Sequence, residues 1–229
     1  RVFAHGWWTN EGQKISKSLG NAIDPVKLVE RFGLDQTRYF LLREVPFGND
    51  GDFSNRAMVN RINAELANGL GNLAQRSLSI IAKNCEGKLP EPLTFTAEDE
   101  ALLSQAKALL GTVRDAFDRQ QFHDAMEAIM VVVRAANGYI DVQAPWSLKK
   151  TDLARMGTVL YVLAETVRRV ALLLQPIMPE SISRMLDQLS VPEDKRSFAH
   201  FDDVLVGGTA LPAPQGVFPR HVETEETAS

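Results

Sequence analysis

Cysteine is almost absent from this chain, and histidine is scarce. The 229 residues contain one cysteine, Cys85, so neither a disulfide framework nor a cysteine-rich zinc cluster can form within them. A reducing compartment is the ordinary setting for such a composition. The histidines lack the spacing of metal ligands, so we predict no metal site. They are His5, His123, His200 and His221.

Long apolar runs are also missing. A membrane-spanning helix needs roughly 18 consecutive apolar residues, and the best candidate, residues 125–136, is interrupted by Glu127 and Arg134. The N-terminus shows no signal-peptide pattern and starts with Arg1 rather than methionine. We therefore expect a cytoplasmic protein without a membrane anchor, and we expect this chain to be the later part of a longer protein.

An overall excess of positive charge is missing as well, because the formal net charge is −4. That value argues against a general nucleic-acid binder. The local balance differs, since residues 56–90 contain five basic and two acidic side chains. An RNA could contact this basic segment, although such an excess also occurs on ordinary protein surfaces.

The densest functional signal is the sequence Lys14-Ile15-Ser16-Lys17-Ser18, which we call the lysine loop. A lysine ammonium is a mobile point charge, and serine hydroxyls can donate hydrogen bonds to phosphate oxygens. Two lysines and two serines just after a turn therefore predict a loop that handles a polyphosphate. A basic surface loop without such a role is the alternative.

The lysine loop resembles the KMSKS signature of class I aminoacyl-tRNA synthetases, with Ile15 in place of the usual methionine. Its surroundings resemble the methionyl-tRNA synthetase family more than the leucine, valine, isoleucine or cysteine enzymes. The resemblance extends over nearly the whole chain, and the matching stretches follow the family's order. They are HGWWTNEGQ at 5–13, AIDP at 22–25, PFGNDGDFS at 46–54, LANGLGNLAQR at 66–76 and APW at 144–146.

Helical periodicity dominates the sequence after residue 54. Apolar side chains recur every three or four residues, which predicts amphipathic helices that share a core. The predicted fold is therefore mainly α, with a short mixed segment followed by a helix bundle. The predicted helices cover residues 26–32 and 35–43, a long stretch from 54, and then 97–118, 122–140, 152–174 and 179–189.

Particular residues mark the expected helix ends. Asp24 followed by Pro25 predicts a helix start, and Gly33 its end. Asp35 is expected to cap the next helix. Thr96 with Asp99 has the pattern of a capping box.

The resemblance and the pattern together predict three parts. Residues 1–53 are expected to form the C-terminal end of a Rossmann-type catalytic domain, with a strand ending at residues 2–4 and a turn at 9–12. Stem-contact helices and a glycine-rich loop at 46–54 complete it. The remaining parts are a helix bundle at 54–206 and an extension with an acidic tail at 207–229.

A second candidate site lies on the first long helix. Asn68, Asn72 and Arg76 follow one another at intervals of four, so on an α-helix their side chains lie along one face. Amide and guanidinium groups can bind the edges of unpaired bases. Gly69 and Gly71 each cost a helix about 1 kcal/mol relative to alanine, which indicates close approach of another backbone. Glycines that admit a neighbouring helix, beside solvent-facing asparagines, are the alternative.

The resemblance implies roles for these residues. Asn68, Asn72 and Arg76 match the anticodon-reading helix of the family, and Trp146 matches the tryptophan that stacks on an anticodon base. Covering the end of the bundle is the alternative role of Trp146. The implied activity is that of a methionine–tRNA ligase, which uses methionine and ATP with Mg²⁺, and the implied partner is tRNA(Met) with its CAU anticodon.

The implied mechanism has two steps, formation of methionyl-adenylate and transfer of methionine to the tRNA. Lys17, assisted by Lys14, is expected to neutralise the charge that builds on the departing pyrophosphate. Ser16 and Ser18 are expected either to bind ATP phosphates or to hold the shape of the loop.

Some family features do not occur in these 229 residues, including a His-Ile-Gly-His type motif. The methionine pocket and the inserted zinc domain of the family have no counterpart either. We therefore expect the 229-residue polypeptide by itself to catalyse no ATP–pyrophosphate exchange. Exchange of labelled pyrophosphate above a protein-free control would contradict this. The extra C-terminal dimerisation module of some relatives is also missing, so we expect a monomer.

Two other functions match parts of the pattern. The first is a stand-alone tRNA-binding or regulatory helical protein that has lost the chemistry, and the second is another class I synthetase. An intact lysine loop argues against the first, because a pure binder has no use for Lys17. The second is disfavoured by the set that matches the anticodon reader, Asn68, Asn72, Arg76 and Trp146.

Overall fold

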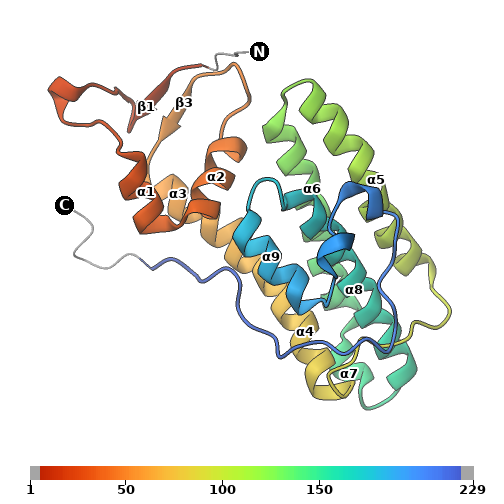
Figure 1. The fold of residues 1–229 in the computed structure, drawn as a ribbon. Helices are drawn as coiled ribbons and strands as arrows, with labels where there is room; N and C mark the ends of the chain where they lie inside the picture. Colours follow the sequence, from red (N-terminus) through yellow and green to blue (C-terminus); the bar gives the residue numbers. More distant parts are fainter. Residues whose placement is uncertain (1–5, 223–229) are drawn as a thin grey trace.

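A small sheet with two helices stands beside a bundle of long helices in the computed structural model, which describes residues 6–222 (Figure 1). The strand end predicted at residues 2–4 and the acidic side chains after residue 222 lie outside the described residues. Within residues 6–222, no helix is both long and apolar enough to cross a membrane.

The sheet has the strand order β2-β1-β3. Its strands are β1 (Trp8–Asn10), β2 (Gln13–Lys14) and β3 (Gly51–Phe53). β1 and β2 are antiparallel and enclose the predicted turn, where Glu11 and Gly12 both have positive φ. β3 lies parallel to β1, with Trp8 opposite Gly51, inside the segment that we predicted to be a loop. The sequence did not indicate this short strand, because the glycines and aspartates of residues 46–54 are uncommon in strands and favour turns.

Two helices follow the lysine loop, α1 (Pro25–Phe32) and α2 (Leu34–Arg43). The predicted start of α1 is confirmed, since the Asp24 carboxylate accepts a hydrogen bond of 2.9 Å from the Val26 N–H. Gly33 ends α1 as predicted, in a positive-φ conformation (φ 91°) that favours glycine. Because α2 begins directly afterwards, the two helices share Gly33 as their junction.

The capping role predicted for Asp35 is wrong. The helix α2 begins at Leu34, so Asp35 lies inside its first turn. The buried Asp35 carboxylate accepts a hydrogen bond of 2.6 Å from the Ser181 N–H, in the first turn of α9 (Pro179–Gln188). Arg38 adds hydrogen bonds of 2.7 Å and 2.9 Å to the carbonyls of Ile177 and Pro176. Tertiary contact with the bundle therefore overrides the local capping preference, and α2 is fastened to the turn before α9.

A long helical rod leads from the sheet into the bundle. It consists of α3 (Asn55–Arg61), the π-helix η2 (Ile62–Gly71) and α4 (Asn72–Asn84). The Ser54 hydroxyl caps it, accepting a hydrogen bond of 3.0 Å from the Ala57 N–H. The predicted apolar stripe is buried except for Val59, which is half-buried; its members are Met58, Ile62, Leu66, Leu70 and Leu73. The predicted α-helix is interrupted, because residues 62–71 have the wider i→i+5 hydrogen bonding of a π-helix.

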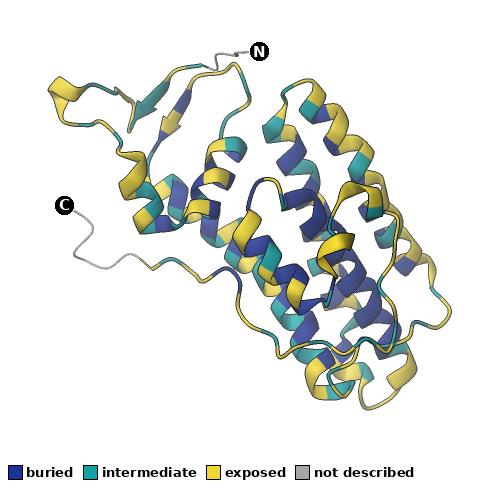
Figure 2. Cartoon of the chain, viewed as in Figure 1, coloured by how far each residue is buried: buried dark blue, intermediate teal, exposed yellow. Residues whose placement is uncertain are grey.

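The remaining helices surround α8 (Leu153–Leu174), which is buried from Met156 to its end (Figure 2). They are α5 (Ala97–Asp118), α6 (Phe122–Gln143), the short α7 (Pro145–Leu148) and α9. The four long helices confirm the predicted ones to within three residues at each end. Residues 141–150 lie between two of the predicted helices, and the structure has the end of α6 and the short α7 there.

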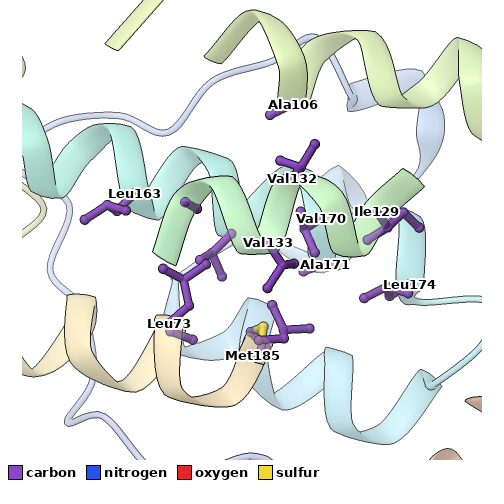
Figure 3. Close-up of a cluster of buried hydrophobic side chains, with 14 of the residues drawn as sticks. Leu73, Ala106, Ile129, Val132, Val133, Leu163, Val170, Ala171, Leu174 and Met185 are labelled. Atoms are coloured by element: carbon purple, nitrogen blue, oxygen red, sulfur yellow. The ribbon is translucent and has the colours of Figure 1, made fainter. Parts of the chain in front are cut away.

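Side chains from five of these helices meet in one apolar core (Figure 3). Leu73 of α4, Ala106 of α5, Val132 of α6, Leu163 of α8 and Met185 of α9 are among its members. Full burial of a valine, leucine or methionine side chain contributes about 1.5–3 kcal/mol to the stability of the fold. The rod is thus anchored in the bundle through α4.

A buried carboxylate ties three of the helices together. Asp99 is fully buried in the first turn of α5 and accepts a hydrogen bond of 3.0 Å from the Thr96 N–H, as the predicted capping box requires. It also accepts hydrogen bonds from Tyr139 of α6 and from Arg155 of α8, the latter at 2.8 Å from Nη2. Burial alone would raise the pKa of Asp99, but the hydrogen bonds from Arg155 and Tyr139 outweigh burial and lower it.

The C-terminal segment crosses the bundle and ends beside the rod (Figure 1). At its start, the buried Arg168 of α8 pairs with Glu165 and donates to the Phe201 carbonyl at 3.1 Å. At its end, His221 and Asn63 exchange two hydrogen bonds of 2.8 Å, and Phe218 is buried. This segment therefore contacts both the bundle and the π-helix.

Candidate functional site

The lysine loop starts at Lys14, the last residue of β2, and leads toward α1. Its second half is the 3-10 turn η1 (Lys17–Leu19), capped by Ser16, whose hydroxyl accepts a hydrogen bond of 3.3 Å from the Ser18 N–H. Gly20 closes the turn with positive φ (67°), and its N–H donates to the Lys17 carbonyl at 3.2 Å. This backbone geometry therefore favours a glycine directly after the loop.

The two serines of the loop bind one another. Their hydroxyl oxygens lie 2.7 Å apart, within hydrogen-bonding distance, in addition to the backbone hydrogen bond that Ser16 accepts. In the free chain these contacts maintain the shape of the loop, which is one of the two roles predicted for Ser16 and Ser18. Contact with ATP stays a prediction for both.

Asn21 clamps the lysine loop, although the sequence analysis did not single it out. Its Oδ1 accepts a hydrogen bond of 2.8 Å from the Ser16 N–H, and its Nδ2 donates one of 3.0 Å to the Lys14 carbonyl. Asn10 of β1 in turn donates to the Asn21 carbonyl at 3.0 Å. The available signal was an asparagine directly after the glycine that ends the loop, because asparagine often forms such local hydrogen bonds.

The lysine side chains are the unengaged part of the loop. Lys14 and Lys17 are exposed, and within residues 6–222 neither ammonium has a hydrogen-bond or ion-pair partner. Ile15 between them is half-buried. Both charges can therefore turn toward an incoming anion without breaking a contact in the protein.

The second candidate site lies where the π-helix meets α4. Asn68 and Asn72 are exposed, and neither amide has a hydrogen-bond partner in the described part of the chain. Arg76, one turn further along α4, is half-buried. The rod thus presents two free amides and one guanidinium near the far end of the bundle.

The structure brings Arg76 and Trp146 together from distant parts of the sequence. The guanidinium carbon lies 5.3 Å from the centroid of the Trp146 ring, a cation–π distance. Trp146 is 40% exposed. Asp141 was not predicted to belong to this site, but its Oδ1 accepts a hydrogen bond of 2.6 Å from Arg76. No local pattern marks Asp141, because its partner lies on another helix.

A strained turn presents Trp146. Ala144 ends α6 in the left-handed region (φ 44°, ψ 59°), which costs a residue with a Cβ about 1–2 kcal/mol. Pro145 follows as the first residue of α7, where its missing N–H costs no hydrogen bond. The turn therefore ends α6 and directs α7, which carries Trp146, away from the α6 axis.

Gly69 and Gly71 lie inside the π-helix. A Cβ on Gly71 would lie 2.9 Å from the Leu66 carbonyl oxygen and 3.3 Å from the Phe218 Cβ. The predicted close approach is thus made by the carbonyl of its own helix and by a side chain of the C-terminal segment, and not by another backbone. Next to Gly69 the nearest other helix is α6, through Val133.

Two of the five basic side chains in residues 56–90 are paired with carboxylates. Arg61 forms ion pairs of 3.0 Å with Glu44 and 2.9 Å with Glu65, and Arg76 pairs with Asp141. Within residues 6–222 the other three basic side chains of this segment, Arg56, Lys83 and Lys88, form no ion pair, so part of the local positive charge stays unpaired. In residues 6–222 there is also no group of three or more His, Cys, Asp or Glu side chains that could hold a metal ion.

Two family descriptions match this sequence. The one described as "tRNA synthetases class I (M)" matches residues 1–78. The one described as "Anticodon binding domain of methionyl tRNA ligase" matches residues 89–229. The two matched stretches are separated by residues 79–88, which include the end of α4, so the first contains the lysine loop and the second contains Trp146.

Curated relatives match over almost the full chain. The methionine–tRNA ligase of Brucella suis biovar 1 (strain 1330) is 62% identical over 227 residues, which cover 99% of this chain and 44% of that protein. The ligase of Mesorhizobium japonicum is 60% identical over 225 residues, with coverages of 97% and 44%. This chain therefore spans less than half the length of the relatives it matches.

A solved structure also matches over almost the full chain. Mycobacterium tuberculosis methionyl-tRNA synthetase in complex with methionyl-adenylate superposes with a TM-score of 0.93 at 55% identity. The match covers 96% of this chain and 44% of that one.

Proposed function

This chain belongs to the methionyl-tRNA synthetase family, and from that premise we propose that it carries the mobile ATP loop and the anticodon reader of a methionine–tRNA ligase. Its fold combines the end of a class I catalytic domain with a helical anticodon-binding domain. The observation that carries the proposal is the pairing of Arg76 with Trp146 beside the free amides of Asn68 and Asn72.

The proposed first step forms methionyl-adenylate from methionine and ATP, with ATP bound as its magnesium complex. A carboxylate oxygen of methionine attacks the α-phosphorus, the bond to the β-phosphate oxygen breaks, and pyrophosphate leaves with the electron pair. Lys17 neutralises the charge that builds on the leaving group, and Lys14 assists. The unpaired ammonium groups of both lysines support this role, because such a contact accelerates the reaction only if it strengthens in the transition state.

The proposed second partner is tRNA(Met). The amides of Asn68 and Asn72 would bind the edges of unpaired anticodon bases, and Trp146 would stack on one base. In the free chain Arg76 covers part of this ring, so an incoming base must displace or share its guanidinium. Asp141 offers Arg76 a second partner during that exchange. We propose that the ligase acts as a monomer in the cytoplasm.

Anticodon binding tests this function directly. We expect this chain to bind a CAU anticodon stem-loop more tightly than a CAC stem-loop at fixed, moderate salt. Trp146→Ala should weaken CAU binding by about 1–3 kcal/mol, or roughly 5- to 150-fold, because stacking contributes that much per base. Fluorescence anisotropy with labelled stem-loops measures both quantities.

The matched control is Trp7→Ala. Trp7 is 79% exposed and precedes β1, on the other part of the molecule, so its loss should leave stem-loop affinity unchanged. Equal binding of the two stem-loops would contradict the proposed anticodon reader and would favour another class I synthetase. If the chain prefers the CAU stem-loop but the activity in a ligase assay does not depend on Lys17, the result would favour the stand-alone tRNA-binding protein.

A further inference from the structure

A separate hollow lies next to the lysine loop, between the residues that follow the loop and helix α1. It has a volume of about 250 Å³. Its lining includes Asn21 at the end of the loop, Lys27 and Arg31 on α1, and Asn55 at the start of α3. None of the four residues proposed to bind ATP lines it. The hollow is therefore distinct from the surface that the lysine side chains occupy.

The hollow is rich in unused hydrogen-bond donors. Within residues 6–222, the Lys27 ammonium, the Arg31 guanidinium and the Asn55 amide have no hydrogen-bonded acceptor. The Arg31 Nε is completely buried. A buried donor without an acceptor is costly, whereas a charge-assisted hydrogen bond to an anion removes that cost. The donors therefore favour a ligand that offers several oxygen acceptors.

The charge of the hollow points to an anion as well. Among the described residues that line it, Asp24 is the only carboxylate, and one of its oxygens already caps α1 through the Val26 N–H. Two cations thus face one carboxylate that is partly engaged. The Arg31 guanidinium also lies 4.9 Å from the centroid of the Phe32 ring, which restricts its position. A planar, oriented guanidinium matches the geometry of a phosphate.

Asn21 connects the hollow to the lysine loop. It lines the hollow, and its amide forms the two hydrogen bonds that hold Ser16 and Lys14. A ligand that contacts this end of the loop would therefore stabilise the clamped form. Gly20, which also lines the hollow, bonds to the loop only through its backbone N–H, which donates to the Lys17 carbonyl at 3.2 Å.

We propose that this hollow binds a phosphate group and that occupancy stabilises the lysine loop through Asn21. The phosphate belongs either to the backbone of a bound RNA or to the pyrophosphate that the reaction releases. The proposal rests on the proposed function for the presence of these two ligands. It assigns Lys27, Arg31 and Asn55 a binding role that the anticodon site and the ATP loop do not require.

NMR of the 229-residue chain tests the proposal, because the Nε–H of each arginine gives its own ¹H–¹⁵N signal. Inorganic pyrophosphate and a short RNA hairpin without a CAU loop are titrated separately. We expect a saturable shift of the Arg31 Nε–H signal together with the Ser16 and Asn21 amide signals. Arg31→Gln should weaken the binding that moves the Ser16 and Asn21 signals by about tenfold, the loss of one charge-assisted hydrogen bond.

Two variants serve as controls. Arg114→Gln removes another arginine that lies over a phenylalanine ring, with its guanidinium 6.0 Å from the centroid of Phe198, and should change nothing. Lys14→Gln/Lys17→Gln removes the charges of the loop and should leave the Arg31 response in place. A response that disappears in this double variant would place the anion on the loop lysines and overturn the proposal.

The two titrations, one with pyrophosphate and one with the RNA hairpin, identify the source of the phosphate. A response to pyrophosphate alone assigns the hollow to the reaction product, and a response to the hairpin alone assigns it to RNA backbone. If neither ligand moves the Arg31 signal, the proposal is wrong. Arg31→Gln should keep the preference for CAU stem-loops, so failure here is distinguishable from failure of the proposed anticodon reader.

Discussion

Replacing Lys17 with alanine in a full-length ligase that contains this chain is expected to lower kcat for ATP–pyrophosphate exchange by about 10²–10³-fold. Losing one preorganised group that stabilises transition-state charge has an effect of this size. The fold should be unaffected, because the Lys17 side chain is exposed and its ammonium forms no hydrogen bond or ion pair in the described residues. Steady-state exchange kinetics and a melting curve measure the two effects separately.

The distribution of the loss between kcat and KM is informative. A contact made mainly in the transition state lowers kcat and kcat/KM together, whereas a ground-state contact raises KM for ATP. Lys83→Ala, which removes another exposed lysine near the C-terminal end of α4, is the matched control and should leave both constants unchanged. An unchanged kcat in Lys17→Ala would eliminate the proposed role of this lysine.

Replacing Asp99 with alanine should have the largest effect on stability. The substitution leaves Arg155 and the Tyr139 hydroxyl without their shared acceptor inside the bundle. Breaking a buried ion pair in this way costs about 3–5 kcal/mol. Urea unfolding followed by circular dichroism gives the free energy of unfolding. Asp152→Ala, which removes only the exposed cap of α8, should cost about 1 kcal/mol and provides the comparison.

The Asp99 effect should also depend on pH. Its pKa is lowered in the folded chain, so its contribution is fully present above the unfolded pKa of about 3.9 and is lost as the pH falls through the folded value. The stability difference between the parent chain and Asp99→Ala should therefore be constant near neutral pH and narrow below about pH 4. A difference that stays constant into acid would show that Asp99 stabilises the bundle without its charge.

Local signals in the sequence predicted most of the helices. Asp24 before Pro25 and Thr96 before Asp99 mark helix starts through hydrogen bonds within the same turn, so no tertiary information is needed to recognise them. The apolar stripe along the rod is equally local. Asp35 shows the limit of this approach, because its carboxylate bonds to Ser181, on a helix that no pattern around Asp35 could indicate.

The two candidate sites differ in the same respect, because one depends on local sequence signals and the other on tertiary contacts. The lysine loop is a continuous motif, and its geometry follows from Ser16, Gly20 and Asn21 inside or next to it. The anticodon candidates were found only because their pattern resembles a family. Their assembly was not predictable, since Asp141 holds Arg76 across two helices, and the wider turns of the π-helix leave no sequence signature beyond two glycines.

The π-helix determines the direction in which the anticodon candidates point. In an α-helix each residue turns the chain by about 100°, and i→i+5 hydrogen bonds place more residues in every turn. The side chains of Asn72 and Arg76 therefore point in a different direction around the helix axis than they would if an α-helix continued unbroken after Met58. Deleting a single residue between 62 and 71 would let the segment tighten and rotate every later side chain of the rod. The direction in which the later side chains of the rod point is thus set by the number of residues in the π-helix. Substitutions that preserve the length of the chain cannot easily change it.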